Sequence, residues 1–125
     1  MAPSALLPLL VSLLLSVALL TARVEGKPCG MGNVQIYQVP NGFGQGHIPE
    51  YVVQIVNAYD SPVHNVHVAC GEFASARLVN PRVFKRLQPN DCLVNEGKPL
   101  EANTLLAFFY TNSRPYDLAV SSVEC

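Results

Sequence analysis

Tryptophan is absent from this sequence, and neither sign of charge is in excess. Eight Lys and Arg residues stand against nine Asp and Glu residues, which gives a formal net charge of -1 at pH 7. Nucleic-acid-binding domains usually carry a clear excess of Lys and Arg. The charge balance argues against that class and equally against a polybasic membrane-surface protein. The missing tryptophan removes the ring that platforms for stacking on sugars commonly use.

The sequence motifs of several enzyme classes are missing as well. The chain contains no G-x-S-x-G elbow, no glycine-rich phosphate loop and no C-x-x-C redox pair. Its carboxylates are scattered, and nothing in the sequence pairs two of them as glycosidases do. We therefore expect no catalytic activity and no cofactor. An Asn-x-Ser/Thr sequon is absent too, so N-glycosylation is not expected.

Histidine is the remaining candidate for chemistry, with His47, His64 and His67 in the chain. Side chains alternate between the two faces of a strand. His64 and His67, three residues apart, are therefore expected to point to opposite faces, and no metal site is predicted.

One long apolar run is present, over residues 6–20, where nearly every residue is Leu, Val or Ala. It is shorter than the ~20 residues of a membrane span and typical of a signal-peptide core. Ala22 and Gly26 each provide a small residue before a possible cleavage point. We predict a signal peptide over residues 1–26, cut after Ala22 or Gly26, with an uncleaved membrane anchor as the alternative. Residues 27–125 would then form one extracellular domain.

The four cysteines of the chain all lie in that predicted domain: Cys29, Cys70, Cys92 and Cys125. An even number of cysteines in a short secreted chain predicts two disulfides, and the sequence leaves all three connectivities open. A zinc site is the competing use of four cysteines. Such sites usually draw on closely spaced pairs, whereas dozens of residues separate these cysteines, so disulfides are the better interpretation.

Alternating and β-branched residues predict five strands, over residues 34–39, 51–57, 63–69, 104–110 and 118–123. The second of them is apolar on both faces apart from Gln54, which is typical of a central strand covered on both sides. Short strands separated by turn signals favour a mainly β fold. We predict a small antiparallel β-sandwich, with a small open barrel as the alternative.

The segment between Asn80 and Pro89 fits a strand poorly. Asn80 is a favourable helix N-cap, and Pro81 suits the first helical position. The apolar residues fall on one helical side: Val83, Phe84 and Leu87. The cations fall on the other: Arg82, Lys85 and Arg86. We predict one short helix of about two turns that packs its apolar side and shows its cations to solvent.

Two groups of side chains are candidates for binding a partner. The first is the three cations of the expected helix together with Arg77 upstream, for which an ordinary solvated surface is the simpler interpretation. The second is a set of aromatic rings that sugars stack on, for which core packing is the simpler interpretation: Tyr37, Phe43, Tyr51, Phe73, Tyr110 and Tyr116.

Four segments of the chain resemble the tapetum-determinant family of small secreted plant proteins. They are IPEYVVQIVN (48–57), VHVACGEFASARLVNPRVFKRL (66–87), NDCLVNEGKPL (90–100) and VSSVEC (120–125). Together they cover nearly the whole predicted domain, and their order along the chain makes the resemblance specific.

The resemblance implies a secreted signalling ligand in the apoplast. The best-known members of that family bind the ectodomain of a leucine-rich-repeat receptor kinase in developing anthers, where they promote tapetum formation and limit the number of sporogenous cells. The candidates for receptor contact are Glu72, Phe73, Arg77, Arg82, Lys85 and Arg86. The alternatives are a secreted carbohydrate-binding protein of the cell wall, or a family member that has lost receptor binding.

The chain departs from the family pattern at two places. Members usually carry six cysteines, with an extra close pair just after the strand that here ends at Asn57, whereas this chain has residues 58–63 without cysteine. Glu72 stands where the family tends to have an aromatic residue.

Overall fold

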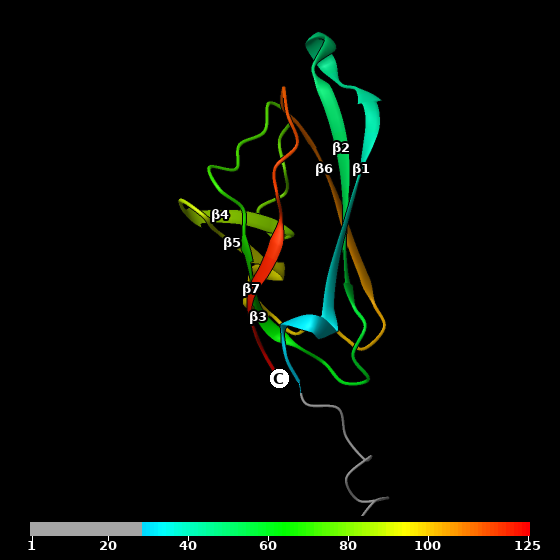
Figure 1. Cartoon of the computed structure of the whole chain (residues 1–125), viewed down its shortest axis with the longest axis vertical. Coiled ribbons are helices and arrows are strands. Elements are labelled where there is room, and N and C mark those ends of the chain that lie inside the picture. The colour runs from blue at the N-terminus through cyan, green and yellow to red at the C-terminus, as the bar shows by residue number, and fades with distance from the viewer. Residues whose placement is uncertain (1–28) are drawn as a thin grey trace, which may run out of the picture.

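The computed structural model describes residues 29–125, and the predicted signal peptide lies outside them. Seven strands are found in this part of the chain (Figure 1): β1 (Val34–Phe43), β2 (Pro49–Asn57), β3 (His64–Ala69), β4 (Phe84–Gln88), β5 (Asp91–Val94), β6 (Leu105–Thr111) and β7 (Ala119–Glu124). Single turns of 3-10 helix lie before β1 and between later strands: η1 (Met31–Asn33), η2 (Gln45–His47) and η3 (Asn95–Gly97). No helix among residues 29–125 has the length and apolar character to span a membrane.

The strands form two sheets, one in the order β1-β2-β6 and the other in the order β4-β5-β3-β7. Neighbouring strands are antiparallel in both sheets. Figure 1 shows the sheets as two layers, with the β1–β2 hairpin extending beyond the rest of the domain. The predicted small antiparallel β-sandwich is confirmed.

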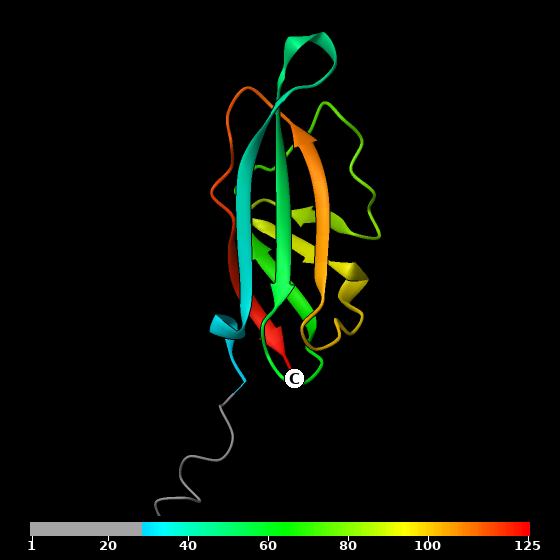
Figure 2. The same cartoon turned by 90° about the vertical axis from the view of Figure 1, so that its right-hand side faces the viewer.

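Strand β2 is central in its sheet, but only one of its faces is covered. Its inward residues are buried: Tyr51, Val53, Ile55 and Asn57. On the opposite face Gln54 is exposed and Val52 only half-buried. Figure 2 shows that no other described element lies over this outer face. The prediction of a strand covered on both sides is therefore wrong.

The helix predicted from Pro81 to before Pro89 is also wrong, because the chain makes one turn and then extends. The Asn80 side chain accepts a hydrogen bond from the backbone N–H of Arg82 at 3.0 Å. The Asn80 carbonyl accepts bonds from the N–H groups of Val83 (2.9 Å) and Phe84 (3.1 Å). Asn80 thus caps a turn as its residue type indicates, and β4 begins directly afterwards.

Sheet pairing explains why the turn does not continue as a helix. Phe84 pairs with Val94, Lys85 with Leu93 and Arg86 with Cys92. Phe84 is buried, whereas Leu87 is 48% exposed. Leu87 does not reach the core. The apolar side of the predicted helix would therefore gain little stabilisation from burial. The hydrogen bonds to β5 decide the conformation instead.

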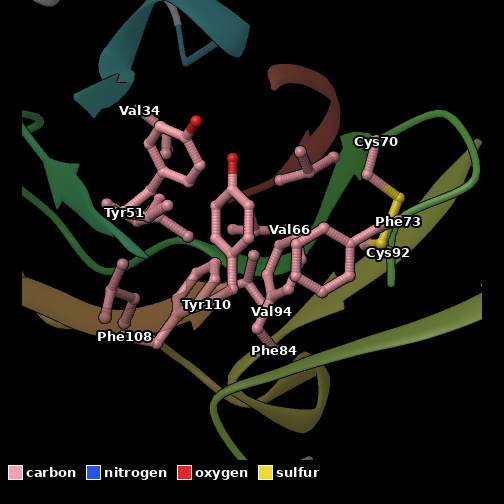
Figure 3. Packing of buried hydrophobic residues seen from close by; sticks show 14 of the residues in the cluster. Val34, Tyr51, Val66, Cys70, Phe73, Phe84, Cys92, Val94, Phe108 and Tyr110 are labelled. Carbon is pink, nitrogen blue, oxygen red and sulfur yellow. A yellow bond between two sulfur atoms is a disulfide. The ribbon is translucent and has the colours of Figure 1, made fainter. Parts of the chain in front are cut away.

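The core between the sheets centres on Phe73, which lies in an irregular segment rather than in a strand (Figure 3). Its ring contacts rings from both layers. The centroid distances are 5.0 Å to Phe84 of β4, and 6.3 Å and 5.1 Å to Phe108 and Tyr110 of β6. Tyr116 adds a contact at 5.3 Å. Aromatic pairs at such separations stabilise beyond their buried area, so Phe73 fastens the irregular segment to both sheets.

The buried hydroxyl of Tyr110 is satisfied by a closed polar network. It donates to the side-chain carbonyl of Gln38 and accepts the backbone N–H of Tyr116 at 3.0 Å. The Gln38 amide donates in turn to the Tyr116 carbonyl at 2.8 Å. Burial raises the pKa of Tyr110 above its ordinary value. The network ties β1, β6 and the 112–118 loop together without an unpaired polar group.

Asn57, which is completely buried, fastens the other end of β2. Its amide donates to the carbonyls of Ser61 and Leu100, both at 3.0 Å. Its side-chain oxygen accepts the backbone N–H of Tyr59 at 2.9 Å. One side chain therefore fixes the turn that follows β2.

Both disulfides expected from the sequence form. Cys29 pairs with Cys125 and joins the two ends of the domain, with 6.3 Å between their Cα atoms. Cys70, just after β3, pairs with Cys92 of β5 at a Cα separation of 6.1 Å.

Removing the buried disulfide with the double substitution Cys70→Ala/Cys92→Ala should lower the free energy of unfolding by about 3 kcal/mol, because the bond closes a loop of moderate length in the unfolded chain. Urea unfolding followed by circular dichroism measures this loss. The exposed Ser122→Ala variant is the control and should unfold as the wild type does. An unchanged midpoint in the cysteine variant would contradict the prediction.

Candidate functional site

The irregular segment that follows Phe73 is fixed along the end of β6. The Thr111 N–H donates to the Ser75 hydroxyl at 3.0 Å, and the Thr111 carbonyl accepts the N–H of Ala76 at 2.9 Å. The Arg77 N–H donates to the Thr111 hydroxyl at 2.9 Å. Three consecutive residues are thus held by one residue of the sheet, which gives the segment a fixed position without regular secondary structure.

Arg77, a predicted receptor contact, makes two side-chain interactions. Its guanidinium lies 2.6 Å from a Glu50 carboxylate oxygen and 5.0 Å from the centroid of the Phe109 ring. The hydrogen bond from Arg77 is the main cause that lowers the pKa of Glu50 below its ordinary value, and a hydrogen bond from Asn41 acts in the same direction. The charge of Arg77 is therefore compensated within the domain.

The next residue, Leu78, is the most exposed of the large apolar residues described, at 89%. It projects because Arg77 is held against Glu50 on one side and Val79 packs against the core on the other. Leu78 and Arg77 border two depressions of the surface. One, of about 520 Å³, reaches the tip of the β1–β2 hairpin at Gly44. The other, of about 240 Å³, reaches β4.

The cations Arg82, Lys85 and Arg86 surround β4, the edge strand of its sheet. Because neighbouring strand residues point to opposite faces, Lys85 and Arg86 do not share one face as they would on the predicted helix. Arg82 and Lys85 border a depression of about 400 Å³ together with Leu87. Lys85 and Arg86 border the 240 Å³ depression together with Leu78.

None of the ion pairs found within residues 29–125 involves these three cations. Glu96, which borders the 400 Å³ depression, pairs with Lys98 at 3.3 Å instead. The result is a positively charged surface with one projecting apolar side chain. We call it the β4 edge surface, and it consists of Arg77, Leu78, Arg82, Lys85 and Arg86.

The two other predicted contact residues have different surroundings. Glu72 is exposed in the turn that follows Cys70. Phe73 is only 7% exposed, and its ring packs in the core. Phe73 thus positions the segment that carries Arg77 and Leu78 rather than presenting its own ring. No sequence pattern indicates that Leu78 projects, since its neighbours along the chain are of mixed polarity.

His64 and His67 lie on the same face of their sheet, contrary to the expectation from strand alternation. The pairing of β3 with β7 is irregular between them, and Asn65 adopts a φ of 47°. The Nε2 atom of His64 lies 3.2 Å from a carboxylate oxygen of Glu124, and the Nδ1 atom of His67 lies 2.7 Å from a carboxylate oxygen of Asp91. Each ring therefore contacts a different carboxylate. Residues 29–125 contain no group of three or more potential metal ligands.

The aromatic residues considered for sugar binding are mostly inside the domain. Tyr51, Phe73 and Tyr110 are buried. Of the others, Phe43 is 63% exposed at the hairpin tip, where it stacks on His47 at a centroid distance of 4.8 Å. Tyr37 is 51% exposed on β1. This set therefore does not form a shared platform.

The pair between Arg77 and Glu50 yields a test of the geometry. In Arg77→Gln, the pKa of Glu50 should rise toward its ordinary value of 4.5. A carboxyl with a lowered native pKa stabilises the fold above its ordinary pKa and loses that contribution as the pH falls through the native value. The wild type should therefore be the more stable protein near neutral pH, with the difference vanishing well below pH 4.5.

An NMR titration of the Glu50 carboxyl carbon and urea unfolding as a function of pH measure these two effects. Arg114→Gln, which changes an exposed arginine of another loop, serves as the control. An identical Glu50 pKa in wild type and Arg77→Gln would show that the pair does not form in solution.

Comparison with known proteins places this sequence in a family. The profile described as "Tapetum determinant 1, C-terminal" matches residues 30–125. The chain is 43% identical over 102 residues to "TPD1 protein homolog 1" of Arabidopsis thaliana, which covers 80% of this chain and 57% of that protein. It is 39% identical over 118 residues to "TPD1 protein homolog 1A" of Oryza sativa subsp. japonica, which covers 84% of this chain and 50% of that protein.

A third relative, "TPD1 protein homolog 1B" of Oryza sativa subsp. japonica, is 42% identical over 109 residues, which is 62% of its length. The chain thus spans between half and two thirds of the length of these curated relatives. No solved structure matches it. Because the family profile covers nearly every residue of the two-sheet domain, the chain belongs to the tapetum determinant family.

Proposed function

We propose that this chain is a secreted signalling ligand that binds the ectodomain of a plant leucine-rich-repeat receptor kinase and acts in anther cell-fate specification, through tapetum formation and a limited number of sporogenous cells. Its signal peptide, residues 1–26, directs it to the apoplast. Family membership supports the class of function. The β4 edge surface is the observation that carries the proposal to particular residues. The role is binding, without catalysis.

The β4 edge surface shares its content of arginine with binding hot spots. Arginine is enriched in protein interfaces, and a few residues near the centre of the contact usually carry most of the binding energy. Here Leu78 projects between depressions bordered by Arg77 on one side and by Lys85 and Arg86 on the other. An apolar pocket on the partner, rimmed by carboxylates, would match this arrangement.

Electrostatics indicates the charge of the partner. The cations of β4 have no carboxylate within ion-pair distance in the described chain, so an acidic surface would gain their attraction without first breaking a pair. The concave face of a leucine-rich-repeat ectodomain is an extended surface that a compact domain of this size can enter.

A simpler role for the same cations is protection of the sheet edge. Charged residues on an edge strand, Lys above all, prevent pairing with a strand of another molecule. That role needs Lys85 and Arg86 to be charged but makes no use of the exposed Leu78. The two variants below separate the roles, because the first changes the charge of the cations and the second removes the apolar contact of Leu78.

Charge reversal of Arg82, in the turn before β4, and of Lys85 and Arg86 in β4 should weaken receptor binding by at least about tenfold, mainly through a slower association rate. The variant is Arg82→Glu/Lys85→Glu/Arg86→Glu, and biolayer interferometry against the immobilised receptor ectodomain measures it. Arg114→Glu is the charge-change control. Because the three side chains are exposed, thermal unfolding should change little. Equal affinity of the folded triple variant and the wild type would remove β4 from the interface.

Leu78→Ser should weaken the same binding by about tenfold or more, with the loss mainly in a faster dissociation rate, as for a buried apolar anchor. Met31→Ser is the matched control, because Met31 is also an exposed apolar residue, at 52%, but lies in η1. An affinity loss shared equally by the two variants would show that Leu78 has no special place in the contact.

A further inference from the structure

The outer face of the β1-β2-β6 sheet is a largely apolar surface over which no other described strand or loop lies (Figure 2), and at one end of it the Arg77 guanidinium lies over the Phe109 ring. Strand register arranges nine side chains on it in three rows of three. The rows are Gln35, Val56 and Leu105; Tyr37, Gln54 and Ala107; and Val39, Val52 and Phe109. We call these nine residues the outer sheet face.

Exposure is concentrated on this face. Tyr37 is 51% exposed, Val39 53%, Leu105 53% and Phe109 38%, and these four are half of the large apolar residues exposed within residues 29–125. An antiparallel sheet with one face in water normally carries polar residues there. Contiguous apolar surface on a small domain marks an interaction site.

The outer sheet face is uncharged, and this limits the kind of partner. All nine of its residues are neutral, and at one end Glu50 and Arg77 neutralise each other at 2.6 Å. An acidic or a basic partner would gain no attraction from such a face. A second copy of the same face meets it without any like-charge contact, as a two-fold interface requires.

Association through the sheet edges is less favoured than association through the face. Pro40 lies in β1, an edge strand, where it has no N–H to offer, and the pairing of β1 is irregular between Pro40 and Phe43. At the end of β6, the N–H and carbonyl of Thr111 are already bonded to Ser75 and Ala76. Both features hinder the addition of a strand from a second molecule.

The size of the face sets the expected strength of the contact. Three strands about 4.8 Å apart and a length of about five residues at ~3.3 Å each give on the order of 240 Å² of sheet per copy. Stable interfaces bury about 800 Å² per partner. The contact should therefore be reversible rather than obligate.

We propose that two copies of this domain associate face to face through the outer sheet face, as a reversible two-fold dimer. Packing of the two sheets would follow the aligned arrangement of β-sandwiches. Lys85 and Arg86 of the β4 edge surface lie in β4 of the other sheet, so each copy in the dimer keeps these two cations exposed. The proposal stands independently of receptor binding.

Sedimentation equilibrium over a range of concentrations tests it, on protein secreted from the full chain by a eukaryotic host with its disulfides intact. The wild type should pass from monomer mass toward twice that mass as its concentration rises. Val39→Lys should weaken the association by at least about tenfold, because it places two like charges in the contact. Leu105→Lys, at the other end of the face, should act in the same direction.

Leu87→Lys is the matched control, since Leu87 is 48% exposed on β4 of the other sheet. It should leave the association unchanged, and thermal unfolding of each variant verifies its fold. A wild type that stays at monomer mass up to its solubility limit would overturn the proposal. So would a loss of association in Leu87→Lys as large as in the two variants of the face.

Discussion

The packing of Phe73 against rings of both sheets is the interaction on which the arrangement of the molecule depends. Phe84 brings β4 to this ring, and Phe108 and Tyr110 bring β6 (Figure 3). The residues after Phe73 form no helix or strand, so their position follows from this contact and from the hydrogen bonds to Thr111. A core aromatic thereby determines where Leu78 and the cations of β4 stand relative to one another.

A surface held in this way is preorganised for binding. The disulfide between Cys70 and Cys92 closes next to Phe73, and Asn90 adds two hydrogen bonds with Gly71, at 2.5 Å and 2.9 Å. Little conformational freedom is left to lose when a partner docks, which favours affinity without a large interface. The two surfaces proposed for binding also differ in charge and in the sheet that carries most of their strand residues. One sheet carries the strand residues of the charged β4 edge surface, and the other carries the neutral outer sheet face.

Local patterns in the sequence were sufficient for much of the fold and insufficient where tertiary contacts decide. Alternating, β-branched and apolar runs predicted strands at the positions of β1, β2, β3, β6 and β7, because half-buried and buried strands have these patterns. Asn80 caps a turn as predicted, but the residues after the turn pair with β5 and form a strand instead of the predicted helix. Strand β5 was missed, since four residues offer little pattern, although Cys92 to Val94 is an apolar run between Asp91 and Asn95. The disulfide connectivity and the projection of Leu78 both depend on long-range packing, which no local pattern contains.

The most direct test of the central claim is hydrogen–deuterium exchange of the disulfide-intact protein with and without the receptor ectodomain. Exchange of backbone amides reports local opening and cover residue by residue. The account predicts additional protection in the complex over residues 74–88, with little change over η1 and the start of β1. Protection confined to other parts of the domain, in a complex shown to form, would contradict a binding surface built around Leu78 and β4.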